Sequence, residues 1–198
     1  MPLRDVFILK NPQKAYNYHG DIMNKSKLFK LSVAGFVFVS ILGTLSHFVY
    51  EWSNYNIITA PFVPVNESIW EHLKLLFFPY IIWAVIQYYL MKKEKGLIIS
   101  KAIGSLAGMA TIVIFFYTYS GISCKSIDIL NILSFFIGIA VAFVCDNYFI
   151  KSSKLKNTGA DCAGVVLIII TAALFFIFTF APPFTPLFKD PISSTYGI

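Results

Sequence analysis

The chain of 198 residues is 57% hydrophobic and only 13% charged, and its mean hydropathy is +0.71. A soluble domain carries about 25% charged residues, so this composition excludes an ordinary soluble protein and indicates an integral membrane protein. A formal net charge of +6 would suggest nucleic-acid binding in a soluble protein. Here the lysines stand in short segments between apolar runs and do not alternate with aromatic residues, so we expect no nucleic-acid partner.

The N-terminal 22 residues are polar and mixed in character, and they lack the pattern of a cleavable secretory signal. We predict an N-terminal extension over residues 1–22, a transmembrane bundle over residues 23–181 and an external proline-rich tail over residues 182–198. The tail alternates prolines with apolar residues, which suggests an ordered, extended segment. We expect it to cover the polar groups at that face.

Five apolar runs are each long enough to cross the hydrocarbon core of a bilayer as a helix. They are predicted at residues 29–51, 69–91, 97–120, 127–149 and 161–181. The fold class is therefore an all-α, polytopic transmembrane bundle with five spans. The loop between the first two spans, over residues 53–68, is rich in Asn and Pro. A re-entrant turn in this loop would make a sixth element.

Lysine placement predicts the orientation of the bundle in the membrane. Nine lysines fall on one side: Lys25, Lys27, Lys30, Lys92, Lys93, Lys95, Lys151, Lys154 and Lys156. The other side has only Lys74, Lys125 and Lys189. We predict a multi-pass protein of the plasma membrane. Because the lysine-rich side of a membrane protein faces the cytoplasm, we expect its N-terminus in the cytoplasm and its C-terminus outside.

Histidine and acidic residues recur at the predicted external ends of the spans. His47 and Glu51 are four residues apart and share one face of the first span. Glu67 and Glu71 have the same spacing where the second span begins, and His72 follows directly. Two imidazoles and one carboxylate with an open position suit catalytic zinc, whereas Mg²⁺ and Ca²⁺ prefer more oxygen ligands. The sequence thus predicts that His47, His72 and Glu67 bind a divalent cation, zinc first, or another polar ligand.

Catalytic and structural roles compete for the remaining polar residues. Glu51 or Glu71 would act as the general base at the metal site. Ser68 and Glu71 also fit a capping box, in which the Glu71 carboxylate bonds back to the Ser68 amide. Glu71 and Lys74 fit an ion pair along the helix. We assign the remaining polar groups at this depth to the same polar site: Lys74, Asp128 and Asn131.

Three stretches give the sequence a family resemblance: HFVYEW at residues 47–52, VNESIWEHLKLLFFP at residues 65–79 and PLFKDPISSTYGI at residues 186–198. With these motifs the chain resembles a family of small bacterial multi-pass membrane proteins of unknown function. The resemblance covers residues 23–198. It implies a membrane location and no particular activity.

The sequence leaves three functions open. The first is a membrane-embedded, metal-dependent hydrolase, and the second is a component of a small-solute or ion transporter that binds a cation or polar ligand at the same cluster. The third is a non-catalytic accessory or scaffold subunit that meets a membrane partner protein or a second copy of itself. Sequence motifs for a serine nucleophile, a P-loop or a dinucleotide fold are absent.

Overall fold

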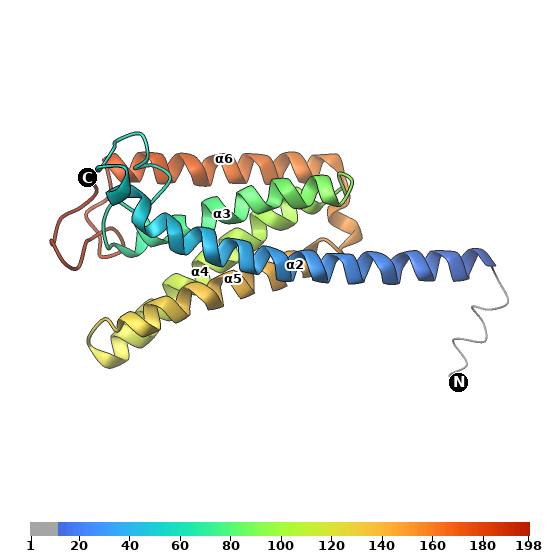
Figure 1. The fold of residues 1–198 in the computed structure, drawn as a ribbon, viewed down its shortest axis with the longest axis horizontal. Helices are drawn as coiled ribbons and strands as arrows, with labels where there is room; N and C mark the ends of the chain where they lie inside the picture. Colours follow the sequence, from blue (N-terminus) through green and yellow to red (C-terminus); the bar gives the residue numbers. More distant parts are fainter. Residues whose placement is uncertain (1–11) are drawn as a thin grey trace. The chain divides into compact units, whose positions relative to one another are not determined.

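The computed structural model describes residues 12–198, with side chains from Ser26 onward except Ser153. Its elements are α2 (Pro12–Trp52), α3 (Ile69–Leu90), α4 (Leu97–Ser123), α5 (Asp128–Phe149), the short 3₁₀ helix η1 (Ser153–Leu155) and α6 (Thr158–Phe180) (Figure 1). No strand occurs in residues 12–198. The predicted all-α fold is confirmed. Of the predicted N-terminal extension, residues 1–11 lie outside the described residues and the rest belong to α2.

Each of the five α-helices contains a segment long and apolar enough to cross a membrane. These segments are Ser26–Trp52, Ile69–Leu90, Leu97–Ser123, Asp128–Phe149 and Thr158–Phe180. They agree with the five predicted spans to within a few residues. Residues 53–68 form successive turns without a helix, so the loop does not add a sixth helical element.

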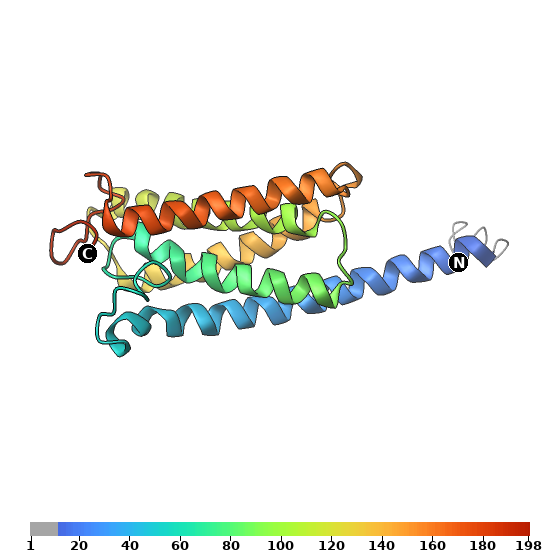
Figure 2. The ribbon, with the colours of Figure 1, turned by 90° about the horizontal axis from the view of Figure 1, so that it is seen from above.

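The chain divides into two compact units, residues 1–34 and residues 35–198. The second unit contains α2 from Gly35 onward and all of α3 to α6, which pack as a helical bundle (Figure 2). Residues 53–68, 124–127 and 181–198 connect or follow helices at one end of this bundle, called here the site end. Residues 91–96 and 150–157 form the other end, called the lysine end, where six exposed lysines lie.

Two glycines allow α4 and α5 to approach at backbone distance. A Cβ atom on Gly108 would lie 2.7 Å from the carbonyl oxygen of Gly138, and one on Gly138 would lie 3.0 Å from the carbonyl oxygen of Gly108. Small residues at such crossings let helices pack closely in membranes, where the hydrophobic effect does not drive their association. This contact makes α4 and α5 a tight pair.

A buried ion pair ties three helices together inside the bundle. Nζ of Lys101 on α4 lies 2.5 Å from Oδ2 of Asp146 on α5. The hydroxyl of Tyr80 on α3 donates to the same oxygen at 2.5 Å. The ammonium also lies 4.4 Å from the centre of the Phe143 ring. Because Lys101 is only 1% exposed, its charge is compensated inside the bundle by the carboxylate and the aromatic rings.

The N-terminus of α4 is capped from another helix. Its N-cap residue, Gly96, has a positive φ of 83° and no side chain to offer. Asp161, in the first turn of α6, accepts hydrogen bonds from the amides of Gly96 at 2.9 Å and Ile98 at 3.0 Å. A Cβ on Gly164 would lie 2.6 Å from the backbone of Ile99, so glycine permits this close approach of α6. A carboxylate at a helix N-terminus also suits the helix dipole.

Candidate metal centre

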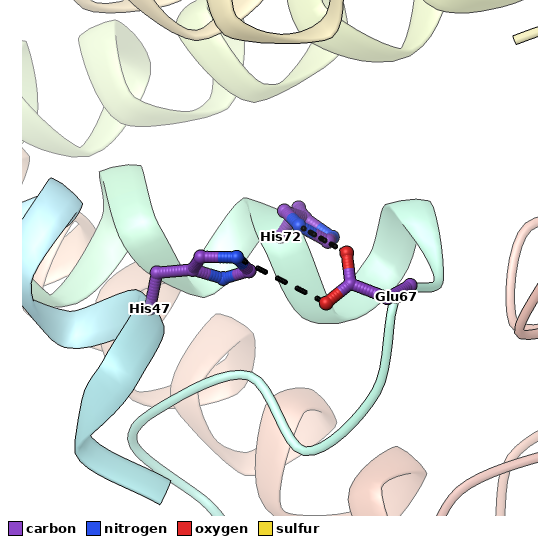
Figure 3. Close-up of side chains that lie close together, drawn as sticks. All are labelled: His47, Glu67 and His72. Atoms are coloured by element: carbon purple, nitrogen blue, oxygen red, sulfur yellow. Dashed lines mark ion pairs between the residues drawn. The ribbon is translucent and has the colours of Figure 1, made fainter. Parts of the chain in front are cut away.

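Three side chains converge at the site end of the bundle: His47 from α2, Glu67 from the loop before α3, and His72 from α3 (Figure 3). Each offers one ligand atom, and these atoms all lie within 4.8 Å of one another. Nε2 of His72 is 3.3 Å from Oε2 of Glu67, and Nε2 of His47 is 3.9 Å from Oε1 of the same carboxylate. In residues 26–198 this is the one group of three such side chains close enough to hold a metal ion.

The orientation of His72 is set by the start of its own helix. Nδ1 of His72 lies 2.9 Å from the carbonyl oxygen of Ser68. Because a carbonyl oxygen can only accept, Nδ1 must donate and so carries a proton. Nε2 is then the nitrogen that faces Glu67, and it needs a proton or a cation between itself and the carboxylate. A histidine that donates one ring N–H to a backbone carbonyl is the arrangement usual for metal ligands.

His47 lies against His72, with the two ring centres 5.3 Å apart. The His47 side chain is 34% exposed, so the group is not sealed inside the bundle. Its Nδ1 atom, however, is buried and has no hydrogen-bond partner among the described residues. Such unsatisfied buried atoms are rare, and they are expected where a water, an ion or a ligand completes a site.

Glu67 is the anionic member of the group, and it lies outside the membrane-spanning segments. The hydrogen bond from His72 lowers the pKa of the Glu67 carboxyl group, and electrostatic attraction to His72 and His47 acts in the same direction. Partial burial opposes this effect without reversing it. Glu67 is therefore ionised at neutral pH, as a metal ligand or an imidazolium partner must be.

Glu71 and Lys74 form a separate, buried network beside this group. Nζ of Lys74 lies 2.5 Å from Oε2 of Glu71 and donates to Oγ1 of Thr179 at 2.6 Å. It also donates to the backbone carbonyls of Ala60 at 3.0 Å and Val63 at 3.3 Å. Lys74 and Glu71 are 0% and 2% exposed. The predicted ion pair is confirmed. Its network attaches the loop in which Glu67 stands to both α3 and α6.

Only half of the predicted capping box is present. Oγ of Ser68 accepts the amide of Glu71 at 3.3 Å, so Ser68 caps α3 as expected. The Glu71 carboxylate does not return to the Ser68 amide, and this part of the prediction is wrong. It instead accepts the amide of Val65 at 3.1 Å and binds Lys74. The Ser68 amide donates to Oδ1 of Asn66 at 2.9 Å. A buried ammonium attracts the carboxylate more strongly than a neutral amide does.

The other predicted site residues stand apart from the three that converge. Glu51 is exposed in the last turn of α2, and its carboxylate is not one of the converging ligand groups. Asp128 is exposed at the start of α5. Asn131 on α5 accepts the hydroxyl of Tyr119 on α4 and donates to Oγ of Ser126, which lies in the turn between the two helices. The structure thus brings together the three predicted metal ligands, whereas the wider polar site divides into separate groups.

Five apolar helices of membrane-spanning length, with a His/Glu group at one end, define a multi-pass helical membrane protein. The sequence model of a family of unknown function (DUF6512) matches residues 21–198, and the chain belongs to this family. The comparison with curated proteins gave no match, and neither did the comparison with solved structures. The resemblance drawn from the motifs is confirmed as membership of a family of unknown function, and the function must be argued from the site.

Proposed function

We propose that this protein binds a divalent cation, zinc first, through His47, Glu67 and His72, and that the site is that of a membrane-embedded hydrolase. The observation that carries the proposal is the convergence of the three ligand atoms within 4.8 Å. The hydrogen bond from Nδ1 of His72 to the carbonyl of Ser68 supports it, because this bond leaves Nε2 of His72 available to bind the metal. Two imidazoles favour zinc over Mg²⁺ or Ca²⁺, which take oxygen ligands.

Three protein side chains are the number that catalytic zinc sites use, which leaves a fourth position for water or a substrate. Zinc held by these residues would supply Lewis-acid polarisation of a carbonyl or phosphoryl oxygen and a water activated for hydrolysis. Glu67 supplies the negative charge of the ligand set, and the histidines supply two neutral nitrogens. Glu51 is exposed on the same helical face as His47 and is the candidate general base, since Glu71 is committed to Lys74.

Metal analysis of the detergent-purified protein tests this proposal. We expect near-stoichiometric zinc in the wild-type protein and its loss in His47→Ala and His72→Ala. Two matched controls should keep the metal: His19→Ala, which removes the third histidine of the sequence, and Glu51→Gln, which removes a carboxylate outside the ligand set. Absence of any divalent metal from the wild-type protein, or equal metal in all variants, would overturn the metal site. Metal that is retained without hydrolysis of ester or phosphate substrates would favour cation transport.

The orientation belongs to the same proposal: the site end faces outward from the plasma membrane and the lysine end faces the cytoplasm. The lysine distribution supports it, because six exposed lysines lie at one end of the bundle. Cys124 is exposed at the site end and serves as a natural reporter. An impermeant thiol reagent on intact cells should label Cys124 when the other two cysteines are replaced by serine. A cysteine introduced as Lys154→Cys in a chain without other cysteines should stay unlabelled, and the opposite pattern would reverse the orientation.

A further inference from the structure

Residues 184–198, called here the strap, fold back onto the segment that carries the candidate ligand Glu67. The carbonyl of Gly197 accepts Nδ2 of Asn66 at 2.9 Å. The carbonyl of Leu187 accepts the amide of Trp70 at 3.1 Å. The strap therefore bonds to the chain on both sides of Glu67, one residue before it and three residues after it.

The strap is an ordered structure held to the bundle by its own contacts. Asp190 organises a turn, since its Oδ1 accepts the amide of Ile192 at 2.9 Å and its Oδ2 accepts the hydroxyl of Ser193 at 2.6 Å. The Phe188 ring packs on Trp70 with ring centres 4.8 Å apart. The amide of Ile198 donates to the carbonyl of Thr179 at the end of α6, at 3.2 Å. The strap thus bridges α6 and the segment before α3.

Asn66 connects the strap to the site. Its Nδ2 donates to Gly197, while its Oδ1 accepts the amide of Ser68. The single side chain therefore spans Glu67, and Ser68 is also the residue whose carbonyl holds Nδ1 of His72. Glu67 itself is 43% exposed, so its place depends on the backbone on either side of it.

We propose that the strap, acting through Asn66, is a positioning element that holds the Glu67 carboxylate against His72 and so sets the metal affinity of the site. The inference rests on the proposed metal function, and it assigns the strap no ligand of its own. Fixed supporting groups around metal ligands typically change metal affinity by about 10- to 100-fold. Residues 184–198 take that supporting role for the one ligand of this site that does not come from a helix.

Gly197 offers a variant that disturbs the strap without touching the site. Its φ is +66°, and an added Cβ would lie 2.8 Å from the carbonyl oxygen of Thr179. Gly197→Ala is therefore expected to push the end of the strap away from Thr179 and to break the hydrogen bond between Gly197 and Asn66. Asn66→Ala removes the same link from the other side. Asn157→Ala is the matched control, because Asn157 also accepts one amide and donates to one carbonyl, but at the lysine end.

The first measurement is zinc affinity by chelator competition on the full-length protein in detergent. We expect a loss of about tenfold in Gly197→Ala and in Asn66→Ala, and no change in Asn157→Ala. In a Glu67→Gln background, Asn66→Ala should cause no further loss, because its effect passes through Glu67. An equal further loss in that background would mean that Asn66 supports the fold generally, and would overturn the positioning role.

The second measurement, hydrogen exchange over residues 65–70, needs no metal. Gly197→Ala and Asn66→Ala should exchange faster there than the wild-type protein and Asn157→Ala. If the wild-type protein binds no zinc, the proposed function fails, and faster exchange would still support the strap as the element that holds Glu67. Unchanged exchange in both strap variants overturns the inference, whether or not zinc is bound.

Discussion

The buried Lys74 ammonium should contribute more to stability than its ion pair with Glu71 alone. Lys74→Met leaves the Glu71 carboxylate without its cation, in a place where Glu71 is only 2% exposed. It also removes the donor to the carbonyls of Ala60 and Val63. Breaking a buried ion pair from one side costs about 3–5 kcal/mol, and we expect this loss for the single variant.

The double variant separates the ion pair from the rest of the network. Lys74→Met with Glu71→Leu removes both charges, yet it leaves two carbonyls and the Val65 amide without partners. Each unsatisfied buried group costs about 1–3 kcal/mol. We therefore expect the double variant to stay destabilised by about 3 kcal/mol or more.

The second buried pair, Lys101 with Asp146, is the matched comparison. Lys101→Met should also cost about 3–5 kcal/mol. In Lys101→Met with Asp146→Leu, the group left behind is the Tyr80 hydroxyl, which keeps the carbonyl of Ala142 at 3.3 Å. Replacing a buried pair by apolar residues is often neutral or stabilising, so this double variant should return to within about 1 kcal/mol of the wild-type protein.

Equilibrium unfolding by SDS in mixed micelles, followed by circular dichroism, gives the free energy of unfolding of all five proteins. The expected result is recovery in the Lys101/Asp146 double variant and no recovery in the Lys74/Glu71 double variant. Equal recovery in both would refute the reasoning, because it would show that the hydrogen bonds from Lys74 to the loop carbonyls add nothing measurable to the free energy of unfolding.

Three further predictions use the same protein preparation. Gly108→Val places a side chain against the Gly138 carbonyl and should cost about 1–3 kcal/mol of unfolding free energy, whereas Gly121→Ala, where an added Cβ meets nothing within 4 Å, should be neutral or stabilise by up to about 1 kcal/mol. Asp161→Ala uncaps α4 and should cost about 1–2 kcal/mol, with faster amide exchange at Ile98 and Ile99; Asp128→Ala, which removes an acidic residue that makes no capping bond, should cost less, and equal losses would contradict the capping role. Because the pKa of Glu67 is lowered in the folded protein, its stabilising contribution is present above the pKa of the unfolded chain and lost as pH falls through the lowered value. The melting temperature of the wild-type protein should therefore drop more steeply in acid than that of Glu67→Gln, and parallel curves would show that Glu67 contributes nothing to this dependence.

Hydrophobic runs and lysine-rich loops were enough to predict the five helices, because bilayer thickness sets their length. The three candidate ligands were also predicted, since a histidine and an acidic residue at helix ends are the expected signal of a polar site. The strap contacts were not predictable, because Asn66 and Gly197 are 131 positions apart. The sequence offered Glu71 two local partners, the Ser68 amide and the Lys74 ammonium. The burial of Lys74 decided between them.

The pairing of Lys101 with Asp146 was missed for a related reason. Lys101 is the fifth residue of the predicted span at residues 97–120, and no acidic residue lies within four positions of it. Its partner lies 45 positions later, on another helix. Sequence patterns reveal periodicity within one helix, whereas this contact depends on how α4 packs against α5.

The order in which the helices are synthesised decides when the cap on α4 can form. Asp161 accepts amides that precede it by 65 and 63 positions. When α4 emerges from the ribosome, its N-terminal amides have no side-chain cap in their own segment. The first turn of α4 is therefore capped only after α6 has been synthesised, so a later helix completes one that was made two helices earlier.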